Sequence, residues 1–232
     1  MEENKEVKVD TEELKTEATN TVNQVKDTIK KVDIKKDSME TKGFVVEIFK
    51  NPLEKIQEIV AKDNNKHFTY ALIIIAIWMA ANLIAGFFSM TGIFSASMRF
   101  LGISSIGKEI LGIVKVTIQP ILTVIIMSLA IFVMNQKNKK SLITVITAVT
   151  VANIPSVIAA VVGLLSIIGS QVRILTSPLT QLCTVISTIL MYFAAKSISG
   201  EEKNSNFIKK FIIIQAIFYG AYIIIGLLGI YI

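Results

Sequence analysis

Residues 142–168 read LITVITAVTVANIPSVIAAVVGLLSII, and none of them carries a charge. An apolar run longer than about 18 residues is typical of a membrane-spanning helix. Small side chains recur at every fourth position of this run, at Thr144, Ala148, Ala152, Ser156 and Ala160. Because such a row lets the backbones of neighbouring helices approach closely, we interpret Ala148, Ala152, Ser156 and Ala160 as helix-packing residues. The run is then the central helix of a membrane bundle.

Further apolar runs precede and follow the central one, at about 68–88, 111–134, 175–195 and 211–232. The chain has 52% hydrophobic residues, and most of its charges lie in residues 1–67. A soluble domain of this size would spread charge over its whole surface. We therefore predict an all-α, polytopic membrane helix bundle, with five transmembrane helices in residues 68–232. Residues 89–110 contain Arg99, Lys108 and Glu109, and we expect a loop with an interfacial helix there.

The segment before the first span divides into two parts. Residues 1–42 are charged, but apolar residues recur at helical spacing at Leu14, Ala18, Val22, Val25, Ile29 and Val32. We predict a cytoplasmic tail that is partly helical or disordered, with residues 34–42 as a linker. The helix could be solvated, form a weak coiled coil or lie on the membrane. Residues 43–67 predict an amphipathic interfacial helix, restarted at Asn51 and Pro52; a soluble helix packed on the loops is the alternative.

Orientation follows from the basic residues of the short loops, which favour the cytoplasmic side. One side of the membrane would hold the lysines before the first span, those in the loop of residues 135–140 and those around residues 196–210. Arg99, Lys108 and Arg173 would lie on the other. We therefore expect a multi-pass protein of the cell membrane with a cytoplasmic N-terminus and an external C-terminus.

The chemistry that an enzyme needs is scarce in this sequence. Between residues 68 and 232 the acidic residues are Glu109, Glu201 and Glu202, all in expected loops, and the chain has one His and one Cys. An intramembrane protease or a coupled carrier places ionisable groups at membrane depth. We expect no enzyme, no catalytic residue, no metal and no cofactor. Basic residues sit at helix ends and form no patch with aromatic residues, so we expect no nucleic-acid partner.

Polar residues inside the spans suggest a kink and two further roles. Pro155 removes a backbone hydrogen bond and predicts a kink between Val151 and Pro155. This kink could serve only the packing of the helices. Alternatively, a transport path could be lined by Asn153, Pro155, Gln119 and Thr184. Lys115, a charge inside the second span, is explained by snorkelling to the headgroups, and it is also a candidate contact for a lipid headgroup.

Two motifs and the order of the spans resemble a known family. The first is Phe49-Lys50-Asn51-Pro52-Leu53-Glu54 before span one, and the second is Ala148 with Ala152-Asn153-Ile154-Pro155-Ser156-Val157-Ile158 in span three. Together with a short basic loop after span two, they resemble the Yip-domain (Ypt-interacting protein) family in its bacterial type. The resemblance implies five spans; eukaryotic members take part in vesicle traffic and bind Rab-type GTPases and each other. Their cytosolic motif Asp-Leu-Tyr-Gly-Pro is missing here, and with it the argument for GTPase binding.

Two hypotheses of function follow. The first is a non-enzymatic membrane-organising or partner-recruiting scaffold, with membrane lipids, self-association and a cytoplasmic protein bound through residues 1–62 as its partners. The second is a facilitator or membrane subunit of a small-solute or lipid transporter.

Overall fold

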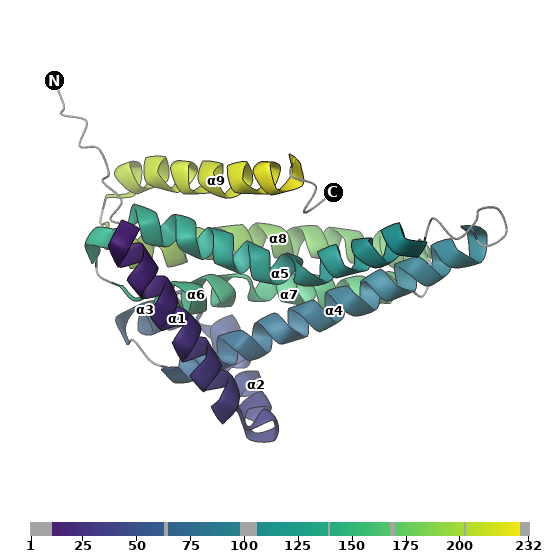
Figure 1. The fold of residues 1–232 in the computed structure, drawn as a ribbon, viewed down its shortest axis with the longest axis horizontal. Helices are drawn as coiled ribbons and strands as arrows, with labels where there is room; N and C mark the ends of the chain where they lie inside the picture. Colours follow the sequence, from purple (N-terminus) through teal and green to yellow (C-terminus); the bar gives the residue numbers. More distant parts are fainter. Residues whose placement is uncertain are drawn as a thin grey trace.

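A computed structural model describes residues 11–62, 65–97, 106–138, 140–167, 170–201 and 203–227 (Figure 1). These residues form helices and no strand, so the predicted all-α fold is confirmed for them. The helices are α1 (Thr11–Lys31), α2 (Ile34–Lys50), α3 (Pro52–Ala61), α4 (Asn65–Ser97), α5 (Ile106–Met134), η2 (Gln136–Asn138), α6 (Leu142–Ala152), α7 (Ile154–Gly163), η3 (Leu164–Ile167), α8 (Ser170–Ser199) and α9 (Asn204–Leu227).

The bundle consists of α4, α5, the pair α6–α7 and α8, which lie side by side along its length (Figure 1). Helices α4, α5, α8 and α9 are each long and apolar enough to cross a membrane. The bent pair α6–α7 makes a fifth span if it is counted as one. The core lies around α6, where Val145, Ala148, Val149, Val151 and Ala152 are almost fully buried. We predicted that residues 142–168 form the central helix of the bundle, and the buried position of α6 agrees with this.

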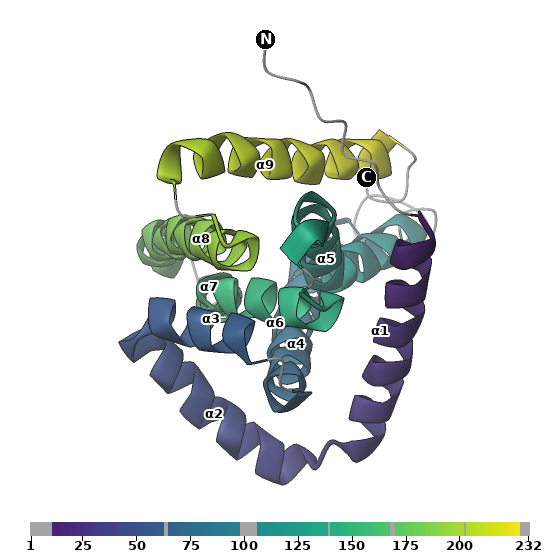
Figure 2. The same cartoon turned by 90° about the vertical axis from the view of Figure 1, so that its left-hand side faces the viewer.

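Helix α9 lies differently from the other long helices. It crosses over α5 and α8 at a steep angle, as Figure 2 shows from the end of the bundle. Its Tyr222 hydroxyl bonds to the Thr123 hydroxyl of α5 at 2.5 Å. Much of its apolar surface is exposed, including Ile212, Ile223 and Ile224. The last predicted span is therefore the most peripheral helix of the bundle.

Two expectations about helix ends are wrong. We predicted a separate loop with an interfacial helix at residues 89–110, but α4 continues to Ser97 and α5 begins at Ile106, while residues 98–105 lie outside the described residues. We also expected the fourth span to begin at about residue 175, but α8 begins at Ser170 and holds Pro178 inside it.

The predicted linker at residues 34–42 is also wrong, because α2 covers it. Asp33 caps this helix: its Oδ1 accepts hydrogen bonds from the backbone N–H groups of Lys35 and Lys36, both at 3.2 Å. Asp37 Oδ2 accepts the N–H of Asp33 at 2.9 Å in return. This reciprocal pair of aspartates satisfies donors that a helix start leaves open. Asn51 does separate α2 from α3 as predicted, although its side chain makes no cap hydrogen bond.

Helices α1, α2 and α3 together form what we call the collar, residues 11–62. In Figure 2 they surround one end of the bundle on two sides and beneath it. The turn between α5 and α6 and the turn between α8 and α9 lie at this same end (Figure 1). The described basic residues that we assigned to one side of the membrane therefore gather at one end of the molecule.

Candidate functional site

The central span is broken at Asn153, where α6 ends and α7 begins with a bend of 45°. Asn153 is 7% exposed, and its Nδ2 donates to the carbonyl of Val149 at 2.9 Å. Pro155, also buried, lies in the first turn of α7, where its missing N–H costs least. The bend lies where the sequence predicts it. The carbonyl that the Asn153 side chain satisfies is that of Val149.

The row of small residues faces the interior of the chain. Ala148 and Ala152 have no exposed surface, while Ser156 and Ala160 are half-buried. The Ser156 hydroxyl and its backbone N–H both donate to the Ser187 hydroxyl oxygen of α8, at 2.8 and 3.0 Å. Ser156 therefore joins α7 to α8 within one molecule, and its partner Ser187 could not be predicted from the sequence pattern.

The candidate path residues lie apart. Gln119 and Thr184 are exposed, whereas Asn153 and Pro155 are buried. Thr184 donates to the carbonyl of Thr180 on its own helix at 2.9 Å. Lys115, the candidate for a lipid headgroup, is 9% exposed, so other parts of the protein cover most of its side chain. Of these candidates, Asn153 and Pro155 are therefore buried at the bend, whereas Gln119 and Thr184 are exposed.

A second proline is compensated between helices. Pro120 lies inside α5 and has no N–H for the carbonyl of Val116, four residues earlier. The side-chain amide of Asn82 on α4 donates to that carbonyl at 3.1 Å. In a membrane core a freed carbonyl finds no water, so this hydrogen bond also ties α4 to α5.

Side chains of the turn between α5 and α6 cap other helices at the collar end. Asn138 Nδ2 donates to the carbonyls of Ile198 and Ser199 at the end of α8. Lys140 Nζ donates to the carbonyl of Val60 in the last turn of α3 at 2.9 Å. A cation there is favourable, since open carbonyls give a helix end a partial negative charge. The turn that we predicted as a basic loop therefore connects collar and bundle.

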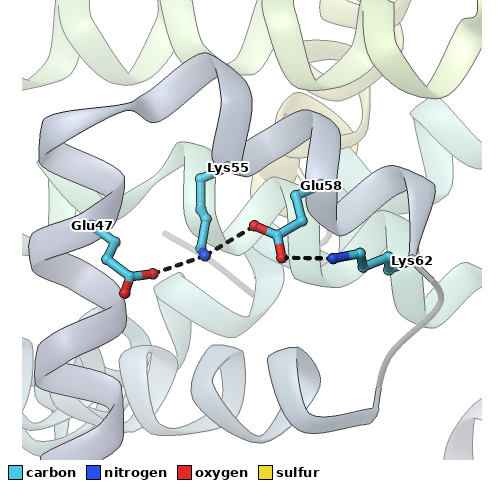
Figure 3. Close-up of polar contacts among 4 residues, drawn as sticks. All are labelled: Glu47, Lys55, Glu58 and Lys62. Carbon is cyan, nitrogen blue, oxygen red and sulfur yellow. Dashed lines mark hydrogen bonds and ion pairs between the residues drawn. The ribbon is translucent and has the colours of Figure 1, made fainter.

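Within the collar, four alternating charges fix α3 against α2 (Figure 3). Lys55 Nζ lies 2.8 Å from Glu47 of α2 and 3.0 Å from Glu58, which also pairs with Lys62 at 3.3 Å. Hydrogen bonds to Glu47 and Glu58 raise the pKa of Lys55. Hydrogen bonds from Lys55 and then Lys62 lower the pKa of the Glu58 carboxyl. Each charge thus stabilises the charged form of its neighbour. Because these pairs are exposed, each contributes only about 0.2–1 kcal/mol to the stability of the fold.

An aromatic cluster connects α2 to the start of α4. The Phe44 ring stacks on His67, with ring centres 5.4 Å apart, and lies 4.9 Å from Tyr70. Tyr70 donates to Glu40 Oε2 at 2.9 Å, and Lys55 Nζ lies 5.8 Å from the centre of the Phe44 ring. His67 is a packed member of this cluster.

Helix α1 is attached differently. The Glu17 carboxylate accepts the backbone N–H of Leu142 at 3.1 Å, in the first turn of α6. A carboxylate at this place is favourable, because the start of a helix has open N–H groups and a partial positive charge. The predicted apolar stripe of α1 faces the bundle across a cavity of about 600 Å³.

These features define an all-α, multi-pass membrane protein with a helical collar at one end. Among the residues that the structure describes, no group of three His, Cys, Asp or Glu side chains could hold a metal ion. Comparison of the chain with models of known families, with curated proteins and with solved structures found no match in any of the three.

Proposed function

We propose that this chain is a non-enzymatic membrane scaffold that recruits a protein partner through its collar. In this proposal it resides in a cell membrane with the collar in the cytoplasm, as a bacterial-type relative of the Yip-domain family. One observation carries the proposal. Ion pairs fix α2 and α3 to each other, and a cap and stacked rings fix them to the bundle, whereas α1 lies over a cavity and is held through Glu17.

The exposed charges of α1 support a recruiting role. Lys15, Asn23, Lys30 and Lys31 are exposed on this helix, along with acidic residues such as Asp27. Mixed charges on a solvated helix give a protein partner both register and discrimination against wrong partners. Self-association belongs to the same proposal, but Ala148 and Ala152 are buried inside one molecule and cannot supply its interface. The exposed apolar side of α9 offers a surface for it.

The transporter hypothesis has less support. Its path requires polar groups that converge on the buried bend, whereas Gln119 and Thr184 are exposed. Among the polar groups near the bend, the Asn153 amide and the Ser187 hydroxyl already have partners within the chain.

Photocrosslinking in cells at native expression tests recruitment. A photoreactive residue replaces exposed Thr19 on α1 and, as the matched control, exposed Leu182 on the lipid-facing part of α8. We expect one defined cytoplasmic protein at position 19, absent at position 182, whose association is lost when residues 1–31 are removed. Identical products at the two positions, or a partner that remains after the truncation, would contradict recruitment by α1.

A further inference from the structure

The cavity beneath α1 is almost entirely apolar. Its lining comes from α1 (Ala18, Val22, Val25, Ile29), α4 (Phe68, Leu72, Ile75), α5 (Ile121, Val124, Ile125, Leu129) and α6 (Leu142, Ile146), with Thr21, Lys26 and Ser128 as its polar members. Its volume of about 600 Å³ falls within the range of ligand pockets. An apolar lining does not hold water well. The cavity therefore suits an apolar occupant.

The position of the cavity favours a bilayer lipid. On α5 the lining of the cavity begins at Ile121, and the helix ends at Met134. This segment is about 20 Å long at about 1.5 Å per residue. This is close to the depth of one leaflet, half of a hydrocarbon core of about 30 Å. Four lining residues are also 40–60% exposed, namely Val22, Ile29, Ile125 and Leu129. The cavity is therefore open at the side, where an acyl chain can enter from the membrane.

Two polar side chains match the polar part of such a lipid. Ser128 is fully buried, and its hydroxyl has no hydrogen-bond partner among the described residues. It lies six residues before the end of α5, about 9 Å along the helix, and therefore nearer to the membrane surface than Ile121. Lys26 lines the same cavity from α1 and is exposed, with Lys30 one turn further on. A cation at the mouth is complementary to an anionic headgroup.

We propose that this cavity holds one acyl chain of an anionic phospholipid from the surrounding bilayer. Ser128 donates to an ester carbonyl of this lipid, and Lys26 pairs with its phosphate. The lipid fills the space between α1 and the α4–α5–α6 face, so it becomes part of the attachment of α1.

Native mass spectrometry of the full-length protein tests this site. The protein is reconstituted in nanodiscs with equal amounts of phosphatidylglycerol and phosphatidylcholine and then released in mild detergent. We expect one retained phosphatidylglycerol. Val25→Trp fills the cavity and should abolish retention, whereas Val46→Trp, on the exposed side of α2, should not. Wild-type protein that retains no phospholipid, or a Val25→Trp variant that retains as much as the wild type, would overturn the proposal.

Polar variants test the site without filling it. Lys26→Gln should lower the enrichment of phosphatidylglycerol over phosphatidylcholine about fivefold, while the matched Lys15→Gln on exposed α1 surface should leave it unchanged. Ser128→Ala should lower retention about threefold. Equal loss in Lys26→Gln and Lys15→Gln would mean that the charge of α1 acts without a site. Because these measurements use purified protein, their failure leaves the recruitment proposal intact.

Discussion

Asn82 and Pro120 show how one residue compensates for another between helices. Pro120 deprives the Val116 carbonyl of its donor, and the Asn82 amide replaces it at 3.1 Å. The sequence allows the freed carbonyl to be predicted, because proline always lacks this N–H. It does not identify the donor, since Asn82 lies on another helix and the register between α4 and α5 depends on their packing. The same holds for Ser156 and Ser187.

This compensation predicts a coupled pair of substitutions. Asn82→Leu alone should lower the free energy of unfolding by about 0.5–2 kcal/mol, because a carbonyl is left without a donor in an apolar surrounding. Pro120→Ala restores an N–H within α5, so the same Asn82→Leu change should cost much less in that background. Unfolding by SDS titration in mixed micelles measures both. Equal costs in the two backgrounds would show that Asn82 does not serve the Val116 carbonyl.

The small residues of α6 predict a second effect at this scale. Ala152 has no exposed surface, so Ala152→Leu must displace a neighbouring helix and should cost about 1–3 kcal/mol. Ala216, exposed on α9, is the matched control, and Ala216→Leu should change the unfolding free energy by less than about 0.5 kcal/mol. The same SDS titration compares the two. If Ala152→Leu were as mild as Ala216→Leu, α6 would not be closely packed.

Among the elements, the long apolar helices were the easiest to predict, and the collar was the hardest. The spans follow from hydropathy alone, because each is an apolar run of sufficient length. Helix α2 was missed between residues 34 and 42, where no apolar period exists and the helix depends on the caps at Asp33 and Asp37. The apolar stripe of α1 predicted only a tail that is partly helical or disordered, and the attachment of α1 through Glu17 joins residues 125 positions apart.

The ion pairs between α2 and α3 predict a response to pH. Glu58 has a lowered pKa, so its contribution is present above the ordinary value of 4.5 and is lost as the pH falls through the lowered one. Lys55 has a raised pKa, so its contribution is present below 10.5 and is lost as the pH rises through the raised one. We therefore expect the α2–α3 contact to be unchanged between about pH 5 and about pH 10.

Distances between spin labels at exposed Val46 and Gln57 measure this contact. Cys183, the single cysteine of the chain, is replaced by Ala for this purpose. The distance distribution should stay narrow across that pH range and broaden outside it. Lys55→Met should broaden it at neutral pH, while Lys50→Met, on exposed α2 surface, should not. Broadening near pH 7 in the unaltered chain would contradict the assigned role of these charges.

At the scale of the whole molecule, the direction of the chain alternates from one long helix to the next, with α6–α7 as one broken span (Figure 1). The number of apolar helices could be predicted from the sequence. The steep crossing of α9 could not, because an evenly apolar helix gives no preference for one face or angle. The gathering of the collar and two turns at one end supports the cytoplasmic assignment that we propose for that end, since their lysines favour that side.

Labelling of single cysteines with a membrane-impermeant reagent tests this arrangement most directly. In the Cys183→Ala background, single cysteines replace Thr19 in the collar and Lys203 between α8 and α9. At the opposite end they replace Leu165 on η3 and Arg173 on α8. All four positions are exposed. The account predicts that positions 165 and 173 react in intact cells, whereas positions 19 and 203 react only after the membrane is opened. Labelling of positions 173 and 203 from the same side would contradict a membrane-spanning α8, and with it the five-span account.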